Sequence, residues 1–375
     1  MKKVLFTASI AKHILRFHLP YLNMFKDAGF EVHVACNDND EIPGIDKNWL
    51  VPFVRSPFSK GHYKAFTVLK EIIDNENFTI IHCHTPMASL LTRFAAKNAR
   101  NNGTKVIYTA HGFHFFTGAP IINWLTYYPI ELYASRFADG IITINREDFV
   151  RIKKFGNQKT KYFATPGVGV DSSKFFPVSE SEKATLRAKL GFAPDDFLIT
   201  YAAEFIDRKN HKFLVNFVKK YGSLYPNLKF LFCGRGVLLD AIKAEVEHLN
   251  LQKQIVFLGF RNDIDAIFKM SDLGISSSKQ EGLGLNLVEE QMCGLPILAT
   301  VDRGHKEIVI QGENGFLYKQ GDLDDLNVHL NKLYNDKALR ERMGAQAIKT
   351  AANFELSNCL RETKIIYNQF LNNVL

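Results

Sequence analysis

The sequence predicts an α/β protein with two doubly wound domains, and three observations lead to this prediction. The length of 375 residues corresponds to two domains at roughly 150 residues each. Short apolar runs alternate with amphipathic segments from end to end, which is the pattern of parallel strands covered by helices. A segment that contains prolines and glycines but no apolar periodicity, 165–177, lies near the middle of the chain and marks the joint.

Each domain is predicted from its own series of apolar runs. Strands are expected over 3–8, 31–36, 80–84, 105–110 and 140–144 in the first half, and over 197–202, 229–233, 255–258, 274–277 and 296–299 in the second. Amphipathic helical patterns separate these runs. Open parallel sheets bind ligands beyond the carboxyl ends of their strands, so functional residues are expected in the loops that follow these strands.

The positive charge of the chain is confined to its first half. The net charge is +8, and residues 1–175 contain 22 Lys and Arg against 14 Asp and Glu, whereas residues 176–375 contain 25 of each. This asymmetry indicates an anionic partner, such as a membrane surface, a phosphate-bearing substrate or nucleic acid. A solvated surface with a chance excess of lysine and arginine is the alternative.

The spacing of the cysteines and the length of the apolar stretches indicate the cellular environment of the protein. The five cysteines are scattered without C-x-x-C spacing, which favours a reducing, cytosolic environment and predicts neither disulfides nor a zinc site. Charged residues interrupt the apolar start of the chain, and no 18-residue apolar stretch occurs, so neither a signal peptide nor a membrane span is expected.

The stretch 276–289 carries the clearest chemical signal. A strand ends there, a loop with Gly282 and Gly284 follows, and a helix is expected to begin near Leu285. Backbone N–H groups at such a helix start favour a phosphate. Glu281 and Glu289, beside that site, could accept hydrogen bonds from sugar or ribose hydroxyls; alternatively, Glu281 caps the helix and Glu289 is a surface residue.

At this point the chain resembles a known family. The resemblance rests on Glu281-x7-Glu289, Cys293-Gly294-Leu295-Pro296-Ile297, Asn314-Gly315-Phe316-Leu317, Gly167-Val168-Gly169-Val170-Asp171 and Leu231-Phe232-Cys233-Gly234-Arg235-Gly236. In order and spacing these motifs resemble retaining glycosyltransferase family 4, which has the GT-B fold. The resemblance implies an acceptor-binding domain over 1–170, a donor-binding domain over 171–354, a cleft between them, and a final helix (about 355–375) that returns to the first domain.

The resemblance also implies roles for the matched residues of the donor site. Glu289 would bind the ribose hydroxyls, Glu281 would contact the donor sugar as a catalytic residue, and Arg261 would border the base. The amides of Leu283, Gly284 and Leu285 would bind the diphosphate. Lys209 would be a catalytic cation, and Arg208 or Arg235 would supply a second one, because Glu204 stands where the family usually has arginine.

Histidines raise the question of a metal. His82 and His84 share one face of a predicted strand, but no Asp, Glu or Cys has convincing spacing to them, so no metal is expected. His111 matches a position at which the family presents a histidine to the reacting sugar, which implies a catalytic role. A structural histidine at a strand end is the alternative.

The predicted function is therefore retaining, metal-independent transfer of a sugar from a nucleotide-sugar, a UDP-sugar, to a lipid-linked saccharide of a surface polysaccharide. Lys12, His13, Lys60 and Lys64 are candidate acceptor-binding residues. The expected setting is the cytoplasm, with peripheral contact to the inner face of the cytoplasmic membrane. No cofactor and no nucleic acid partner are expected.

Two alternatives remain beside this prediction. A nucleotide-sugar epimerase on the same scaffold would act on the donor without a second sugar, and a non-catalytic sensor would bind the nucleotide-sugar without turnover. A dinucleotide-dependent dehydrogenase is rejected, because Gly234-x-Gly236 lacks the third glycine and the acidic residue of that fingerprint.

Overall fold

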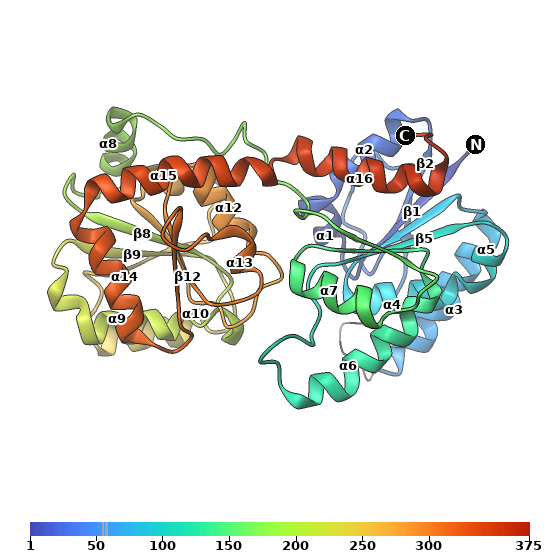
Figure 1. The fold of residues 1–375 in the computed structure, drawn as a ribbon, viewed down its shortest axis with the longest axis horizontal. Helices are drawn as coiled ribbons and strands as arrows, with labels where there is room; N and C mark the ends of the chain where they lie inside the picture. The colour runs from blue at the N-terminus through green and yellow to red at the C-terminus, as the bar shows by residue number, and fades with distance from the viewer. Residues whose placement is uncertain (55, 57–58) are drawn as a thin grey trace. The chain divides into compact units, whose positions relative to one another are not determined.

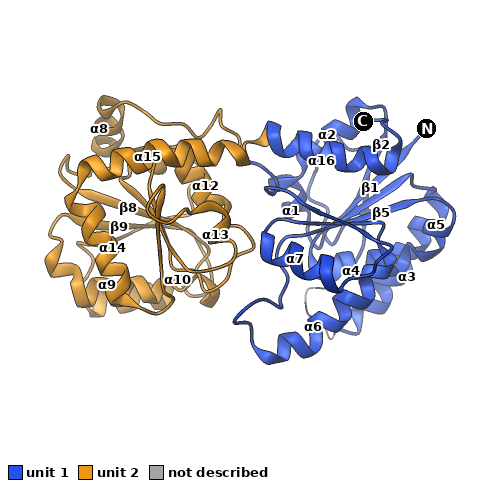
Figure 2. Ribbon diagram, in the orientation of Figure 1, with its two compact units in different colours: residues 1–169, 357–375 blue, residues 170–356 orange. Residues whose placement is uncertain are grey.

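The computed structural model describes residues 1–54, 56 and 59–375, and the chain divides into two compact units (Figures 1 and 2). Unit 1 comprises Met1–Gly169 and Ser357–Leu375, and unit 2 comprises Val170–Leu356. The change of unit between Gly169 and Val170 falls within the segment 165–177, which has no apolar periodicity.

Unit 1 is built on a parallel sheet of seven strands in the order β3-β2-β1-β4-β5-β6-β7. The strands are β1 (Lys3–Thr7), β2 (Glu31–Cys36), β3 (Lys47–Leu50), β4 (Ile80–Cys83), β5 (Lys105–Ala110), β6 (Gly140–Thr143) and β7 (Lys161–Ala164). The helices are α1 (Ala11–Phe17), α2 (Leu19–Asp27), α3 (Gly61–Glu76), α4 (Pro86–Ala95), α5 (Lys97–Asn101), α6 (Ile121–Ala134), α7 (Arg146–Phe155) and α16 (Leu356–Leu371).

Helices cover both faces of this sheet, which explains why its central strands are almost entirely buried. α2 and α16 lie on one side of the sheet, and α3 and α4 lie on the other (Figure 1). All four residues of β4 are buried. The last helix is fixed to this unit by Tyr367, whose hydroxyl is 2.6 Å from Nδ1 of His82 and whose ring packs against Phe25.

Unit 2 repeats the design with six parallel strands in the order β10-β9-β8-β11-β12-β13. The strands are β8 (Phe197–Ala202), β9 (Leu228–Cys233), β10 (Ile255–Gly259), β11 (Leu273–Ser276), β12 (Ile297–Thr300) and β13 (Gly315–Tyr318). The helices are α8 (Glu180–Lys189), α9 (His211–Tyr221), α10 (Leu239–His248), α11 (Ile264–Met270), α12 (Leu285–Met292), α13 (His305–Ile308), α14 (Leu323–Asn335) and α15 (Lys337–Ala351).

The strand orders confirm the predicted fold class of two doubly wound parallel sheets. In each sheet the first strands are added toward one edge and the later strands toward the opposite edge. We call the place where this order changes the switch point; it lies between β1 and β4 in unit 1 and between β8 and β11 in unit 2. At such a point the loops after the two strands diverge and leave a crevice where ligands bind. The loops after β1 and β4, and those after β8 and β11, are therefore the places to search for a site.

Candidate functional site

A charged group lies at the switch point of unit 2. Arg208 and Lys209 belong to the short 3-10 turn Asp207–Lys209 that follows β8, and Glu281 lies in the loop after β11. The ammonium group of Lys209 pairs with Oε1 of Glu281, and Nη1 of Arg208 is 3.2 Å from Oε2 of the same carboxylate. Two cations thus converge on one buried acid, in loops that follow two neighbouring strands of the sheet.

The two cations determine the charge of Glu281. Its side chain is only 9% exposed, and this burial alone would raise its pKa. Lys209 and then Arg208 outweigh burial and lower the pKa of Glu281 to about 2. Glu281 is therefore an anion at neutral pH, and it has no proton to donate to a leaving group.

Buried hydroxyl groups hold the turn that carries the cations. The hydroxyl of Tyr201, on β8, donates to the carbonyl oxygen of Lys209 at 2.5 Å. The hydroxyl of Ser277 lies 3.1 Å from that oxygen and 3.0 Å from the carbonyl oxygen of Asn210. Asn210 has φ of +53°, a left-handed conformation that asparagine tolerates better than most residues. The lysine is therefore positioned by the sheet beneath it.

A third loop, after β12, supports Glu281 from its backbone. Oδ1 of Asp302 accepts hydrogen bonds from the N–H groups of Glu281 (3.1 Å) and Gly304 (2.8 Å), and Nε of Arg303 donates to the carbonyl oxygen of Glu281 at 3.4 Å. A Cβ on Gly304 would lie 2.8 Å from the backbone nitrogen of Leu283, so only glycine fits there. The motifs predict none of these residues, although the strand-end rule applied to β12 would have found them.

The start of α12 lies next to this group in the chain. Leu283 is buried, and Gly284, with φ of +101°, is the N-cap of the helix that begins at Leu285. Glycine has no side chain to cap the first amide groups, so no side chain of the N-cap competes with an external acceptor there. Glu289 is half-buried one turn into the helix and makes an interaction within the protein.

Glu290, the next residue of α12, is fully buried. In the described part of the chain neither of its carboxylate oxygens has a hydrogen-bond partner. Burial, and then the charge of Glu289, raise the pKa of Glu290 well above its usual value, so the side chain is neutral. Its carboxyl group occupies the space over Gly274, where a Cβ would lie 2.1 Å from Oε2.

Arg235 and Arg261 lie apart from the Glu281 group. The guanidinium group of Arg235 stacks on Phe260, 4.8 Å from the ring centre. Arg261 pairs with Asp263 at 2.6 Å. Of the two arginines proposed as the second cation, the structure brings Arg208 to Glu281 and holds Arg235 on an aromatic ring.

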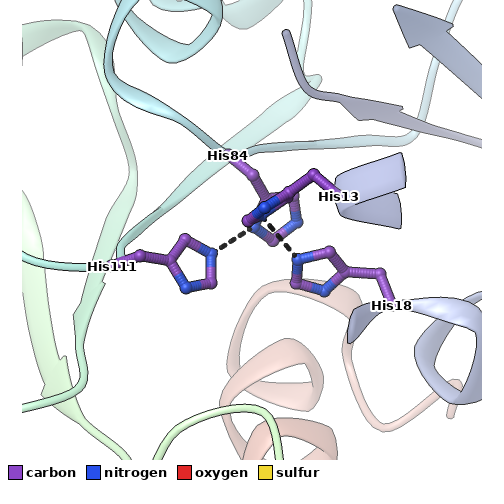
Figure 3. A group of neighbouring side chains, drawn as sticks. All are labelled: His13, His18, His84 and His111. Carbon is purple, nitrogen blue, oxygen red and sulfur yellow. Dashed lines mark hydrogen bonds between the residues drawn. The ribbon is translucent and has the colours of Figure 1, made fainter. Parts of the chain in front are cut away.

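At the switch point of unit 1, histidine side chains lie together. Figure 3 shows His13 of α1, His18 between α1 and α2, His84 after β4 and His111 after β5 with their rings turned toward one another. Burial is the main cause that lowers the pKa of His18, His84 and His111, and the neighbouring imidazoles lower it further. These three rings are therefore neutral at pH 7.

The basic candidates for the acceptor lie on the surface of unit 1. Lys12 is exposed on α1, and Lys60 and Lys64 are exposed at the start of α3. Helix α6 exposes a set of large apolar side chains, whereas its aromatic residues Trp124, Tyr127 and Tyr128 pack against the core. The exposed set is Ile121, Ile122, Leu125, Ile130 and Tyr133. Within the described residues, no helix has the length and apolar character that crossing a membrane requires.

Comparison with known proteins places this architecture in a family. Residues 182–350 match the family model described as glycosyl transferases group 1, and residues 3–145 match that described as glycosyl transferase 4-like. EpsD of Bacillus subtilis (strain 168) is 40% identical over 99% of this chain and 97% of its own length. The UDP-Gal:alpha-D-GlcNAc-diphosphoundecaprenol alpha-1,3-galactosyltransferase of Escherichia coli is 27% identical over 87% of this chain and 86% of its own.

A solved structure shares the fold of the whole chain. Anabaena Alr3699/HepE, in complex with UDP and glucose, superposes with a TM-score of 0.79 at 19% identity, covering 98% of this chain and 100% of its own. Matches to both family models, a 40% identical relative and this fold lead to one conclusion. The chain belongs to the group 1 glycosyltransferases of family 4, which have the GT-B fold.

Proposed function

We propose that this glycosyltransferase moves a sugar from a UDP-sugar to a hydroxyl group of a lipid-linked saccharide, with retention of the anomeric configuration, in the synthesis of a surface polysaccharide. The observation that carries the proposal is the group formed by Arg208, Lys209 and Glu281 at the switch point of unit 2. The amides of Leu283, Gly284 and Leu285 at the start of α12 follow Glu281 directly in the chain.

Departure of the diphosphate is the step that this group would assist. The leaving group gains negative charge in the transition state, and preorganised positive groups stabilise that charge. Lys209, Arg208 and the amides at the start of α12 would be these positive groups. These groups would perform the task that a metal ion performs in other transferases, so we propose that transfer needs neither a metal nor a cofactor.

The two glutamates would act on different parts of the donor. Glu281 is ionised, so its proposed role is to bind hydroxyls of the donor sugar and to stabilise the positive charge that develops on the ring. Glu289 would bind the ribose hydroxyls, and Arg261 and Arg235 would border the nucleotide. His111 would face the reacting sugar, and the acceptor hydroxyl would attack from the face that the diphosphate leaves.

The acceptor and the setting are proposed from unit 1. The Escherichia coli relative is named for a diphosphoundecaprenol-linked acceptor, which supports a lipid-linked acceptor here. The excess charge of residues 1–175, the exposed Lys12, Lys60 and Lys64, and the apolar residues of α6 suit an anionic lipid surface. We therefore place the enzyme at the inner face of the cytoplasmic membrane, as a peripheral protein, with His13 also near the acceptor.

A nucleotide panel followed by a transfer assay tests the proposal. UDP, GDP, ADP and CMP are compared by calorimetry on the wild type, on Lys209→Ala and on the control Lys219→Ala, an exposed lysine of α9. UDP should bind, and Lys209→Ala should weaken it about tenfold, the loss of one charge-assisted contact. Equal UDP affinity of Lys209→Ala and Lys219→Ala would refute the donor site. So would the failure of all four nucleotides to bind the wild type.

The transfer assay separates the competing functions. A UDP-sugar is incubated with a lipid-diphosphate saccharide, and the anomeric coupling of the product is read by NMR, with retention expected. Incubation with the UDP-sugar alone should leave it unchanged, because an isomer would indicate an epimerase. Binding of UDP without turnover of any acceptor would indicate a sensor.

A further inference from the structure

Strand order, and not spacing along the chain, assembles the four histidines of unit 1. β1, β4 and β5 are neighbours in the sheet, and α1 follows β1. The loops and the helix that carry these residues therefore begin at the same place, the carboxyl ends of these strands. His13, His18, His84 and His111 meet there (Figure 3). The expectation of no metal rested on the lack of partners for His84 in the sequence, and the fold supplies three imidazoles.

The distances within the cluster match those of a metal site. One ring nitrogen from each histidine lies within 4.8 Å of those of the other three. Nε2 of His18 is 3.2 Å from Nε2 of His13, and Nδ1 of His84 is 3.3 Å from Nε2 of His111. In a tetrahedron with metal–nitrogen bonds of about 2.0–2.1 Å, the nitrogens are about 3.3–3.4 Å apart. The two nitrogen–nitrogen distances of 3.2 and 3.3 Å already match edges of such a tetrahedron.

One nitrogen of the cluster lacks a partner. Nε2 of His84 is buried, and none of the described residues forms a hydrogen bond with it. By contrast His82, on the same face of β4, has both ring nitrogens bonded, to the hydroxyls of Tyr367 (2.6 Å) and Thr109 (2.8 Å). A buried polar atom without a partner indicates a missing ligand, water or ion, and Nε2 is thus a second nitrogen, besides Nδ1, through which His84 could bind an ion. A neutral imidazole has a lone pair on one ring nitrogen, through which it can ligate a metal ion.

We propose that His13, His18, His84 and His111 form a binding site for one divalent transition cation of the Zn²⁺ class. Imidazole nitrogen suits Zn²⁺, Ni²⁺ and Cu²⁺, whereas Mg²⁺ and Ca²⁺ require oxygen ligands. The ion would engage His111, the side chain that the proposed function directs to the donor sugar, and would therefore inhibit transfer. This inhibition, unlike the binding itself, rests on the proposed function.

Direct metal titration tests the site without any activity measurement. The full chain is freed of metal with a chelator and titrated with Zn²⁺ against a chromophoric competitor. Co²⁺ serves as a spectroscopic probe, because four-coordinate Co²⁺ has intense visible absorption. One ion per chain is expected, with affinity at least tenfold weaker in His13→Asn and in His111→Asn. His248→Asn, an exposed histidine of α10, is the control and should bind like the wild type.

Each outcome decides for or against the site. His13 and His111 are half-buried, and circular dichroism will verify that their variants are folded. Zn²⁺ should raise the melting temperature of the wild type and of His248→Asn more than that of His13→Asn. Equal Zn²⁺ affinity in all four proteins, or stronger binding of Mg²⁺ than of Zn²⁺, would overturn the proposal. A chain that transfers sugar but binds no Zn²⁺ would refute only the metal site, and a chain that binds Zn²⁺ but no UDP would refute only the donor site.

Discussion

Substitution of Glu281 by glutamine separates the structural and the catalytic consequences of its charge. Glutamine resembles the protonated carboxyl group in shape and leaves Lys209 and Arg208 without an anion. The pKa of Glu281 falls from an ordinary 4.5 to about 2, which corresponds to about 3 kcal/mol in favour of the ionised form. We therefore expect Glu281→Gln to destabilise unit 2 by about 2–3 kcal/mol at pH 7, or roughly 4–10 °C in melting temperature.

The pH dependence of this difference has a defined sign. A carboxyl group whose pKa is lowered on folding stabilises the protein above its unfolded pKa, and this contribution disappears as the pH falls through the folded value. The stability gap between the wild type and Glu281→Gln should therefore be full above about pH 5 and should narrow between about pH 4.5 and 2. Thermal unfolding followed by circular dichroism across this range measures it.

UDP provides the second measurement on the same variant. Because the diphosphate supplies new negative charge to Lys209 and Arg208, UDP should bind Glu281→Gln about as well as the wild type and should recover part of the lost stability. The transfer rate constant kcat should fall on the order of a hundredfold. Glu247→Gln, an exposed residue of α10, is the control. If Glu281→Gln were as stable and as active as this control, or bound UDP tenfold more weakly, the reasoning would be wrong.

The other expected results concern neighbouring side chains. Lys209→Ala should lower kcat about as much as loss of the Glu281 charge and also weaken UDP, in initial-rate and calorimetric measurements. Glu289→Ala should raise the donor KM with a smaller change in kcat, since ribose contacts serve ground state and transition state alike. Vesicles with anionic lipid should sediment the wild type at low salt, release it at high salt, and bind Leu125→Glu less; equal binding to neutral vesicles would contradict this. Glu290→Gln should melt at a higher temperature than the wild type at pH 7 but not near pH 4. Above about pH 4.5 the Glu290 carboxyl group ionises when the wild type unfolds, which favours the unfolded state, and glutamine has no such proton to lose.

The apolar runs predict the central strands and the edge strand β10, but they miss the three other edge strands. The apolar runs identify strands such as β4, which helices cover on both faces. The edge strands β3, β7 and β13 are absent from those runs. β3 and β7 have exposed or half-buried residues throughout, so their sequences carry no continuous apolar signal. β13 is largely buried, but its residues were interpreted as part of the motif Asn314-Gly315-Phe316-Leu317 and not as a strand.

The two sites differ in how far sequence could locate them. Lys209 and Glu281 each follow a predicted strand, so the sequence places both at the carboxyl end of the sheet, although it does not predict that they pair. The histidine cluster is different, because His13 and His18 lie on and after a helix whose direction spacing alone does not predict. The buried Glu290 was also unpredictable, since only packing over Gly274 reveals that its carboxyl group lies inside the unit.

The same backbone feature produces both sites, and side-chain chemistry distinguishes them. In each unit the loops after the strands at and beside the switch point carry candidate functional residues. In unit 2 those loops carry Lys209 and Glu281, whose opposite charges hold each other in place and suit a ligand that brings its own charge. In unit 1 they carry neutral imidazoles, of which one, His84, has an unpartnered buried nitrogen. A site of imidazoles can accept a cation without first breaking an ion pair, whereas the two cations of unit 2 attract an anionic ligand. This difference is why we expect phosphate chemistry at one switch point and transition-metal binding at the other.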